Sequence, residues 1–296
     1  MTSNGHDPTL KVATPEVKRL KASGPILVLA VLFVIGAFLS WYFSWFGRSL
    51  SDADISQYLS AEQRPRHVQH ALLQIQQRIE RGDPGAKQWY PQITRLGTQP
   101  ETEFRLTVAW LMGFDSKSEE FHRALGQLVR DPEPIVRRNA ALALVRFNDP
   151  TGRAELVATL KPYELPAPAG GEIASTLKAR SQIARGTLLA RITQPDGREL
   201  EVRSPLPGRL EQIRAPSGSK VVPGQTLLTI NSDEESVWEA LRGLALVGES
   251  DDLPVAEQYA QDSVSSDRIK QQAALTAKAI QSRVGGGSQP VKPTAH

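Results

Sequence analysis

The stretch DPEPIVRRNAALALVRFND, residues 131–149, decides the fold expected for this chain. It opens with an Asp-Pro pair, which is typical of a helix start because aspartate accepts a bond from a free backbone N–H and proline fits the first turn. Apolar residues then recur at helical spacing, as in Ile135, Ala140 and Leu144. This spacing predicts a helix with one apolar face.

Similar helical periodicity extends outward from this stretch, from His67 to about Leu160. It comes in segments of roughly 10 to 17 residues, a usual length for globular helices. Turn signals separate the segments at Asp83-Pro84-Gly85, Gln99-Pro100, Asp131-Pro132 and Asp149-Pro150. Short helices in antiparallel pairs are the arrangement we expect over residues 51–161.

Residues 131–144 also resemble the core of a HEAT-like repeat, whose pattern is an acidic-Pro start, a Val-Arg pair and an alanine-rich helix. The pair here is Val136-Arg137, and Phe104-Arg105 and Ile269-Lys270 are weaker copies of it. The resemblance implies a helical solenoid, with alanines that let helices approach closely and an arginine that bonds toward the adjacent repeat. A generic helical bundle is the alternative.

The character of the chain changes at Pro162. Prolines and glycines end the helices there, and short strand and turn signals follow to residue 232. This block contains two similar halves, one from Gly170 to Ile192 and one from Pro207 to Ile230. The matched positions are Gly186 and Gly224, Leu189 and Leu227, and Ile192 and Ile230. A duplicated strand-turn-strand unit is the simplest interpretation.

Residues 168–232 resemble the biotinyl/lipoyl-like barrel-sandwich domain, which also occurs in HlyD-type periplasmic adaptors. The resemblance rests on VRSPLPG, residues 202–208, and VVPGQTL, residues 221–227. Carrier domains of this fold attach their cofactor to a lysine at the hairpin between the halves, and the hairpin here, Thr193–Arg198, has none. We therefore expect no cofactor. HlyD-type adaptors insert a long coiled coil at the same junction, where this chain has only a Pro-Asp-Gly turn signal.

Helical periodicity returns over residues 233–283, where we expect C-terminal HEAT-like helices after a cap at Ser232. The β-module thus interrupts a helical array, although two independent helical pieces remain the alternative. Glycine-rich residues 284–296 are expected to form a flexible tail.

Residues 24–46, GPILVLAVLFVIGAFLSWYFSWF, carry no charged side chain. At about 1.5 Å per residue, a helix over this run matches a hydrocarbon core roughly 30 Å thick, so we expect a single membrane-spanning helix. Basic residues precede it, which predicts a cytoplasmic tail over residues 1–23 and a periplasmic bulk at a bacterial inner membrane. A cleaved signal peptide is the competing interpretation, but the run is longer than the usual core of about 7–15 residues and lacks a small-residue cleavage site.

The composition excludes several kinds of chemistry. The 35 basic and 32 acidic residues are interspersed, which gives no nucleic-acid footprint. The absence of cysteine excludes disulfides and thiolate sites. His67 and His70 could share a helix face, but no third ligand accompanies them, so we expect no metal site. No nucleophile elbow, phosphate loop or dinucleotide fingerprint occurs, and we predict that the protein is not an enzyme.

These observations together predict a multidomain α + β protein: a transmembrane helix, a HEAT-like solenoid and a small all-β module inserted in it. We expect a scaffold or accessory subunit that binds other envelope proteins through its helical surface, since solenoids recognise proteins. The partner-binding residues we expect are Arg137, Arg138 and Arg146. A shortened HlyD-type export adaptor, assembling as a homo-oligomeric ring, is the alternative; an enzyme with a site assembled from scattered residues is a third.

Overall fold

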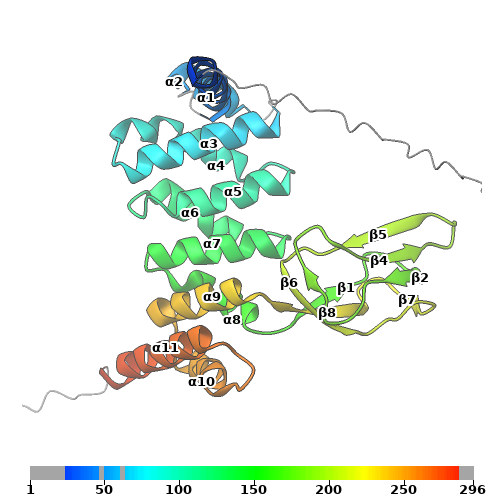
Figure 1. Ribbon diagram of the computed structural model, residues 1–296. Coiled ribbons are helices and arrows are strands. Elements are labelled where there is room, and N and C mark those ends of the chain that lie inside the picture. The colour runs from blue at the N-terminus through cyan, green and yellow to red at the C-terminus, as the bar shows by residue number, and fades with distance from the viewer. Residues whose placement is uncertain (1–23, 47–49, 61–63, 287–296) are drawn as a thin grey trace, which may run out of the picture. The chain divides into compact units, whose positions relative to one another are not determined.

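The computed structural model describes residues 24–46, 50–60 and 64–286 (Figure 1). The chain divides into two units, Met1–Ser49 and Leu50–His296. The first contains helix α1 (Gly24–Phe46). The cytoplasmic tail predicted over residues 1–23 lies outside the described residues. The flexible tail predicted over 284–296 begins inside helix α11 (Asp267–Gly286), and its remainder also lies outside them.

The prediction of a membrane-spanning helix over residues 24–46 is wrong. Within the described ranges, no helix combines the length and the apolar character that crossing a bilayer requires. The sequence argument relied on the absence of charge, which is compatible with helix α1. A membrane span has the further requirement that high hydropathy be sustained over about 20 helical residues, and the fold class is corrected accordingly.

The second unit begins and ends with helices. Its α-helices are α2 (Asp52–Tyr58), α3 (Pro65–Glu80), α4 (Tyr90–Leu96), α5 (Thr102–Met112), α6 (Glu119–Leu128), α7 (Pro134–Arg146), α8 (Arg153–Thr159), α9 (Glu234–Val247), α10 (Leu253–Gln261) and α11. Three short 3-10 helices, η1 (Pro84–Trp89), η2 (Pro150–Gly152) and η3 (Ser250–Asp252), precede α4, α8 and α10 in this part of the chain.

The longer helices stack in chain order (Figure 1). Helix α3 packs on α5, α5 on α7, α7 on α9, and α9 on α11. Helix α4 packs on α6 in a second layer. The two layers are in contact: α5 packs on α6, and both α7 and α9 pack on α8. The structure therefore contains the short, successively packed helices that the periodicity predicts.

The predicted turn signals do begin helices. Asp83 and Asp149 each precede a proline, and each side chain accepts a hydrogen bond from the backbone N–H two residues on, at 2.8 Å in both cases. Both turns continue as a 3-10 helix followed by an α-helix. The bond satisfies a backbone donor that the helix itself leaves free.

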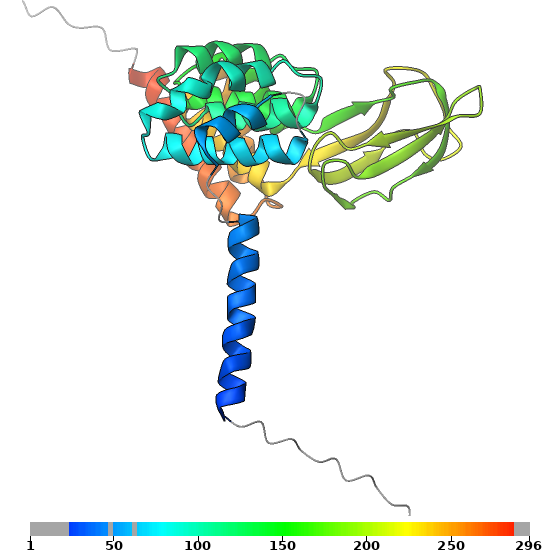
Figure 2. The same ribbon diagram turned by 90° about the horizontal axis from the view of Figure 1, so that it is seen from above.

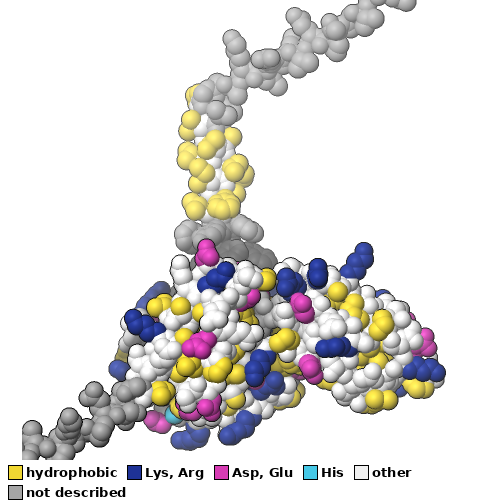
Figure 3. Space-filling model, turned by 90° about the horizontal axis from the view of Figure 1, so that it is seen from below, with side chains coloured by type: hydrophobic (Ala, Val, Ile, Leu, Met, Phe, Trp, Pro, Cys, Tyr) yellow, Lys and Arg dark blue, Asp and Glu magenta, His cyan; other side chains and the backbone are white. Residues whose placement is uncertain are grey.

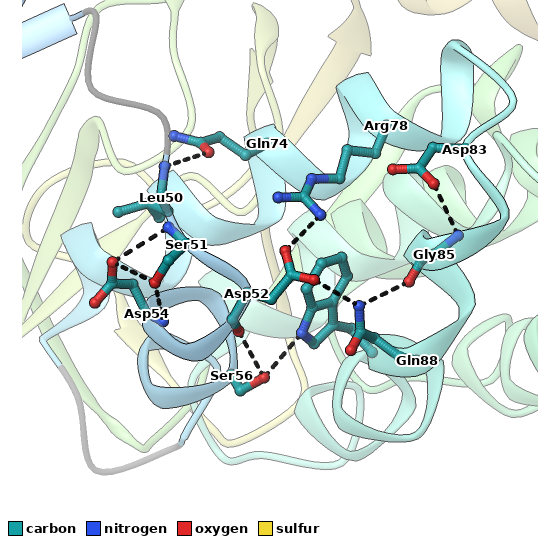
Figure 4. Close-up of polar contacts among 11 residues, drawn as sticks. Leu50, Ser51, Asp52, Asp54, Ser56, Gln74, Arg78, Asp83, Gly85 and Gln88 are labelled. Carbon is teal, nitrogen blue, oxygen red and sulfur yellow. Dashed lines mark hydrogen bonds and ion pairs between the residues drawn. The ribbon is translucent and has the colours of Figure 1, made fainter.

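A polar network fastens α2 to the start of the stack (Figure 4). Arg78 on α3 donates to the Asp52 carboxylate at 2.7 Å. Trp89 Nε1 donates to the Ser56 hydroxyl at 3.0 Å, while the Arg78 guanidinium lies over the Trp89 ring. Ser51 is the N-cap of α2. These contacts attach α2 to α3 and to η1 at the start of the stack.

The block after α8 folds as two antiparallel sheets. Its strands are β1 (Tyr163–Pro166), β2 (Gly171–Thr176), β3 (Gln182–Ile183), β4 (Leu188–Thr193), β5 (Glu199–Arg203), β6 (Gly208–Ile213), β7 (Lys220–Val221) and β8 (Thr226–Ser232). In the described chain one sheet has the order β1-β8-β6-β3 and the other β5-β4-β2-β7. We call residues 163–232 the β-module.

The duplication predicted from the sequence is visible in the strand pairing. Strand β2 pairs with β4 so that Ile173 faces Ile192, and β6 pairs with β8 so that Leu210 faces Ile230. Each pair has an irregularity immediately after that position. Short strand β3 of the first half joins β6, and short strand β7 of the second half joins β2. The two halves therefore exchange their short strands across the module.

The β-module lies beside the helical stack and projects away from it (Figures 1 and 2). It has an apolar core of its own, from Leu165 to Ile230. The helices before and after it share another core, in which Leu156 and Leu160 pack with Leu241 and Leu244. Ser232 also donates to the Thr159 carbonyl at 2.7 Å, so the module leaves and re-enters the helices at neighbouring points.

Candidate functional site

Arg137, the first of the three predicted arginines, joins successive helices. Its Nε donates to Glu155 of α8 at 2.9 Å, and its Nη1 donates to the carbonyls of Asp131 and Pro132 at 2.9 and 3.0 Å. Arg105 repeats this arrangement on α5, binding the Asp131 carboxylate and the carbonyls five and six residues before it. The two arginines therefore link each helix pair to its own entry loop and to an acid farther along the chain.

Arg138 lies in the interior. It is 6% exposed, and its Nε and Nη1 have no hydrogen-bond partner. Its Nε is 3.8 Å from Glu155. Burial lowers the pKa of Arg138, against the opposing effect of Glu155. A side chain so enclosed is not available to a partner protein.

Arg146, at the end of α7, is exposed. Its guanidinium lies 4.8 Å from the centre of the Phe114 ring, and Phe114 in turn makes an edge contact with Trp110 at 4.7 Å. The structure therefore separates the three predicted arginines: Arg137 and Arg138 share Glu155, whereas Arg146 stands two turns farther along α7 among aromatic residues.

Arg146 borders a groove of about 200 Å³ formed by α5, α7 and α9. We call this the stack groove; it is lined by Trp110, Asn139, Leu142, Ala143, Val145, Arg146, Glu239, Arg242, Gly243 and Leu246. Helix α9 lies so close to its neighbours here that a Cβ added at Gly243 would be 2.9 Å from the Leu156 side chain. Large apolar side chains stand at the edges, with Trp110 45% and Leu246 62% exposed.

Cations held on aromatic rings flank the apolar part of the stack groove. The Arg242 guanidinium lies 4.6 Å from the centre of the Trp238 ring. Within the described residues, neither Arg146 nor Arg242 makes an ion pair with a carboxylate. Glu239 is the acidic residue of the lining. Burial, followed by repulsion from Glu235, raises the pKa of Glu239, so its negative charge is disfavoured where it stands.

A larger hollow of about 500 Å³ lies between the β-module and the C-terminal helices, lined by residues such as Arg209, Asn231 and Tyr259. Its polar groups bind one another. The Tyr259 hydroxyl donates to the Leu160 carbonyl at 2.9 Å, and the Asp262 carboxylate accepts bonds from Val264 and Ser265. From the α10–α11 end (Figure 3), charged side chains of both signs are interspersed on the visible face. This hollow has the character of a seam between packed parts.

The histidines of the described ranges sit in separate packing environments. His67 stacks on Tyr58 with 4.6 Å between ring centres, and His70 contacts Gln74. His122 contacts the Asp149 carboxylate at 2.6 Å and stacks on Phe147. Among the described residues, no group of three His, Asp or Glu side chains is placed to hold a metal ion.

Sequence reasoning missed most of the stack groove. Trp110, Arg242 and Leu246 were not singled out, although one signal was available. Each of three apolar residues comes six positions after a buried residue near the start of its helix: Trp110 after Phe104, Leu142 after Val136, and Leu275 after Ile269. When an apolar residue recurs at a repeat position other than a buried one, it indicates a line of outward-facing side chains across the stack.

The scan against models of known protein families finds no match for this chain, and the search of curated proteins finds no similar sequence.

Proposed function

We propose that this protein is a non-enzymatic scaffold that binds another protein through the stack groove. The observation that carries the proposal is the pairing of exposed Trp110 and Leu246 with two arginines that form no ion pair with a carboxylate of the described residues. Tryptophan and arginine are the residues that most often dominate protein-binding energy. The groove is smaller than the 300 to 1,000 Å³ usual for small-molecule pockets, so it suits an anchoring side chain.

The repeated arginine contacts support the HEAT-like resemblance on which this proposal partly rests. Arg105 and Arg137 make equivalent bonds from equivalent positions on α5 and α7. A stack of equivalent helix pairs presents a continuous outer surface, and that is how solenoids recognise proteins.

The β-module supports a binding role over a carrier role. Its β4–β5 hairpin closes within five residues, with Gln194 donating to the Arg198 carbonyl at 2.8 Å. The duplicated strand pairs and this short, lysine-free tip favour a lipoyl-like module without a cofactor. The same short tip argues against the adaptor alternative, whose long coiled coil would begin there.

Site-specific crosslinking in cells tests the proposed function. A photoreactive amino acid is placed at Trp110 or Leu246, and at Arg123 on α6 and Arg130 just after it as exposed controls. We expect positions 110 and 246 to capture the same protein, identified by mass spectrometry, with no such product from the controls. The assignment would be contradicted if neither groove position gave a crosslinked product, or if the control positions gave the same product in equal amount.

A further inference from the structure

We infer that the stack groove takes an acidic, apolar segment of a partner protein, in which leucine-like anchor side chains are flanked by aspartate or glutamate. This inference rests on the proposed function and specifies the chemistry of its partner.

The first support is the apolar line. Leu142 and Ala143 lie in the stack groove, and Trp110 and Leu246 border it. Packed helices lie about 8–10 Å apart, so a line from α5 to α9 is about 16–20 Å long. An extended chain covers that distance in roughly six residues at about 3.3 Å each. The partner segment is therefore short and carries several apolar side chains.

The second support is charge complementarity. Arg146 and Arg242 stand on either side of the groove, each lying over a ring, Phe114 and Trp238 respectively. Stacking orients a guanidinium while leaving its N–H groups to bind carboxylates, which they match in geometry. Among the described residues Arg242 makes no hydrogen bond or ion pair, and it acts on Glu239 of the lining only through a longer-range attraction, so its N–H groups are available to an incoming acid.

A protein carboxylate fits this surface better than a nucleic-acid phosphate. Nucleic-acid sites have a run of cations along the backbone path, whereas the stack groove has two arginines and Glu239. Burial and repulsion from Glu235 raise the pKa of Glu239 and outweigh Arg242 and Arg146, which both act to lower it, so the negative charge of Glu239 is disfavoured beside the two cations. The acidic residues of the partner lie toward Arg146 and Arg242, and its apolar residues toward Leu142.

The experiment selects random 12-residue peptides displayed on phage against the immobilised full chain, then measures the enriched peptides by fluorescence anisotropy. We expect enrichment of peptides that combine aliphatic or aromatic residues with aspartate or glutamate. The double variant R146E/R242E should bind them about tenfold more weakly, the size expected when two exposed attractions become repulsions. Raising the salt concentration should also weaken binding to the wild-type protein.

The matched control is R123E/R130E, which makes the same charge change at exposed arginines on and just after α6. It should bind like wild type, and circular dichroism should show both variants folded. Enrichment of basic or uncharged peptides, no enrichment, or equal affinity for R146E/R242E and wild type would overturn the inference.

A fluorescent random-sequence single-stranded DNA 20-mer is measured in parallel. Binding that depends on Arg146 and Arg242 would assign the surface to phosphates and also overturn the inference. The two proposals fail separately: crosslinks at positions 110 and 246 without acidic peptides would retain the scaffold and reject the partner chemistry, whereas missing crosslinks would reject the scaffold.

Discussion

Arg137 and Arg138 are adjacent on α7 but lie in different environments, because successive residues of a helix point in different directions. Arg137 satisfies one carboxylate and two carbonyls near the surface, whereas Arg138 enters the interior with two N–H groups unpaired. A buried charge that is incompletely hydrogen-bonded and lies 3.8 Å from its nearest carboxylate opposes folding. We therefore regard Arg137 as a structural link and Arg138 as a source of instability.

Replacing Arg138 by methionine is expected to leave the free energy of unfolding unchanged or to raise it by about 1–2 kcal/mol, because an apolar side chain of similar length removes a buried charge that has two unbonded N–H groups and only a 3.8 Å contact to Glu155. Glu155 keeps its bond to Arg137. Urea unfolding measures the change. The control, Arg137→Met, should cost about 1–3 kcal/mol, since it leaves acceptors without donors. A loss above about 1 kcal/mol in Arg138→Met would contradict this account.

The acid dependence of stability should include a contribution from Asp149. Burial acts to raise its pKa, but hydrogen bonds from Thr151 and His122 outweigh it, so the pKa lies below the ordinary value of 3.8. A carboxyl with a lowered folded-state pKa stabilises the fold above its unfolded pKa, and this contribution is lost as the pH falls through the folded value.

We therefore expect Asp149→Asn to be less stable than wild type at pH 6, with the difference shrinking toward pH 3. Chemical unfolding at the two pH values measures it. The control is Asp196→Asn, in the exposed β4–β5 turn, where Asp196 pairs with Arg198 outside the helical core. A difference for Asp149→Asn that stayed constant with pH would show that the charge contributes nothing.

At the scale of elements, the β-module depends on two glycines at the starts of its long strand pairs. Gly171 and Gly208 have φ of 159° and 152°, and a Cβ at either would lie within 2.4 and 2.1 Å of the carbonyl oxygens of Thr193 and Asn231. The duplicated unit thus requires the same residue at the same place twice. This explains the Pro-Gly and Gly-Gly pairs that open the two halves of the sequence.

Gly208→Ala is expected to destabilise the β-module by at least about 2–3 kcal/mol, because the new Cβ collides with backbone in a conformation that disfavours side chains. Hydrogen exchange should show loss of protection in β6 and β8 with protection retained in α5. Gly218→Ala is the control: its φ is 85° but nothing lies within 4 Å of the added Cβ, so it should cost about 1 kcal/mol. If Gly208→Ala and Gly218→Ala destabilised the β-module equally, the collision at position 208 would have to be relieved in the folded protein.

At the scale of the whole second unit, the helices meet without help from the β-module. Helices α8 and α9 pack directly, although 74 residues lie between Thr159 and Glu234 in the sequence. Their shared core contains Leu156 and Leu241. An insertion whose ends are neighbours leaves the surrounding fold a complete core.

Replacing residues 163–231 by a short Gly/Ser linker should therefore leave the helical stack folded. We expect circular dichroism to retain the helical signal and thermal unfolding to remain one cooperative transition, with a modest loss from the broken Arg185–Glu103 ion pair. The single change Arg185→Ala in the full chain serves as the control for that pair. A gradual, non-cooperative melt of the shortened chain would show that the module completes the helical core.

Local patterns determined the local structure of this protein. Helical spacing, Asp-Pro caps and the matched halves of the β block could be read from the sequence because they depend on backbone hydrogen bonding and on residues close together in the chain. The helix over residues 24–46 follows from the same local rules. Its assignment to a membrane does not, because that depends on meeting a length and hydropathy requirement together, and it was wrong.

The candidate site was decided by tertiary structure. The sequence drew attention to three arginines of α7, but only packing shows that Arg138 is enclosed, Arg137 engaged and Arg146 exposed. The stack groove combines Trp110, Arg146 and Leu246 from three helices, with the whole β-module lying between two of them in the chain. The physical reason is that exposure and charge pairing depend on which elements meet, and residues distant in sequence decide that.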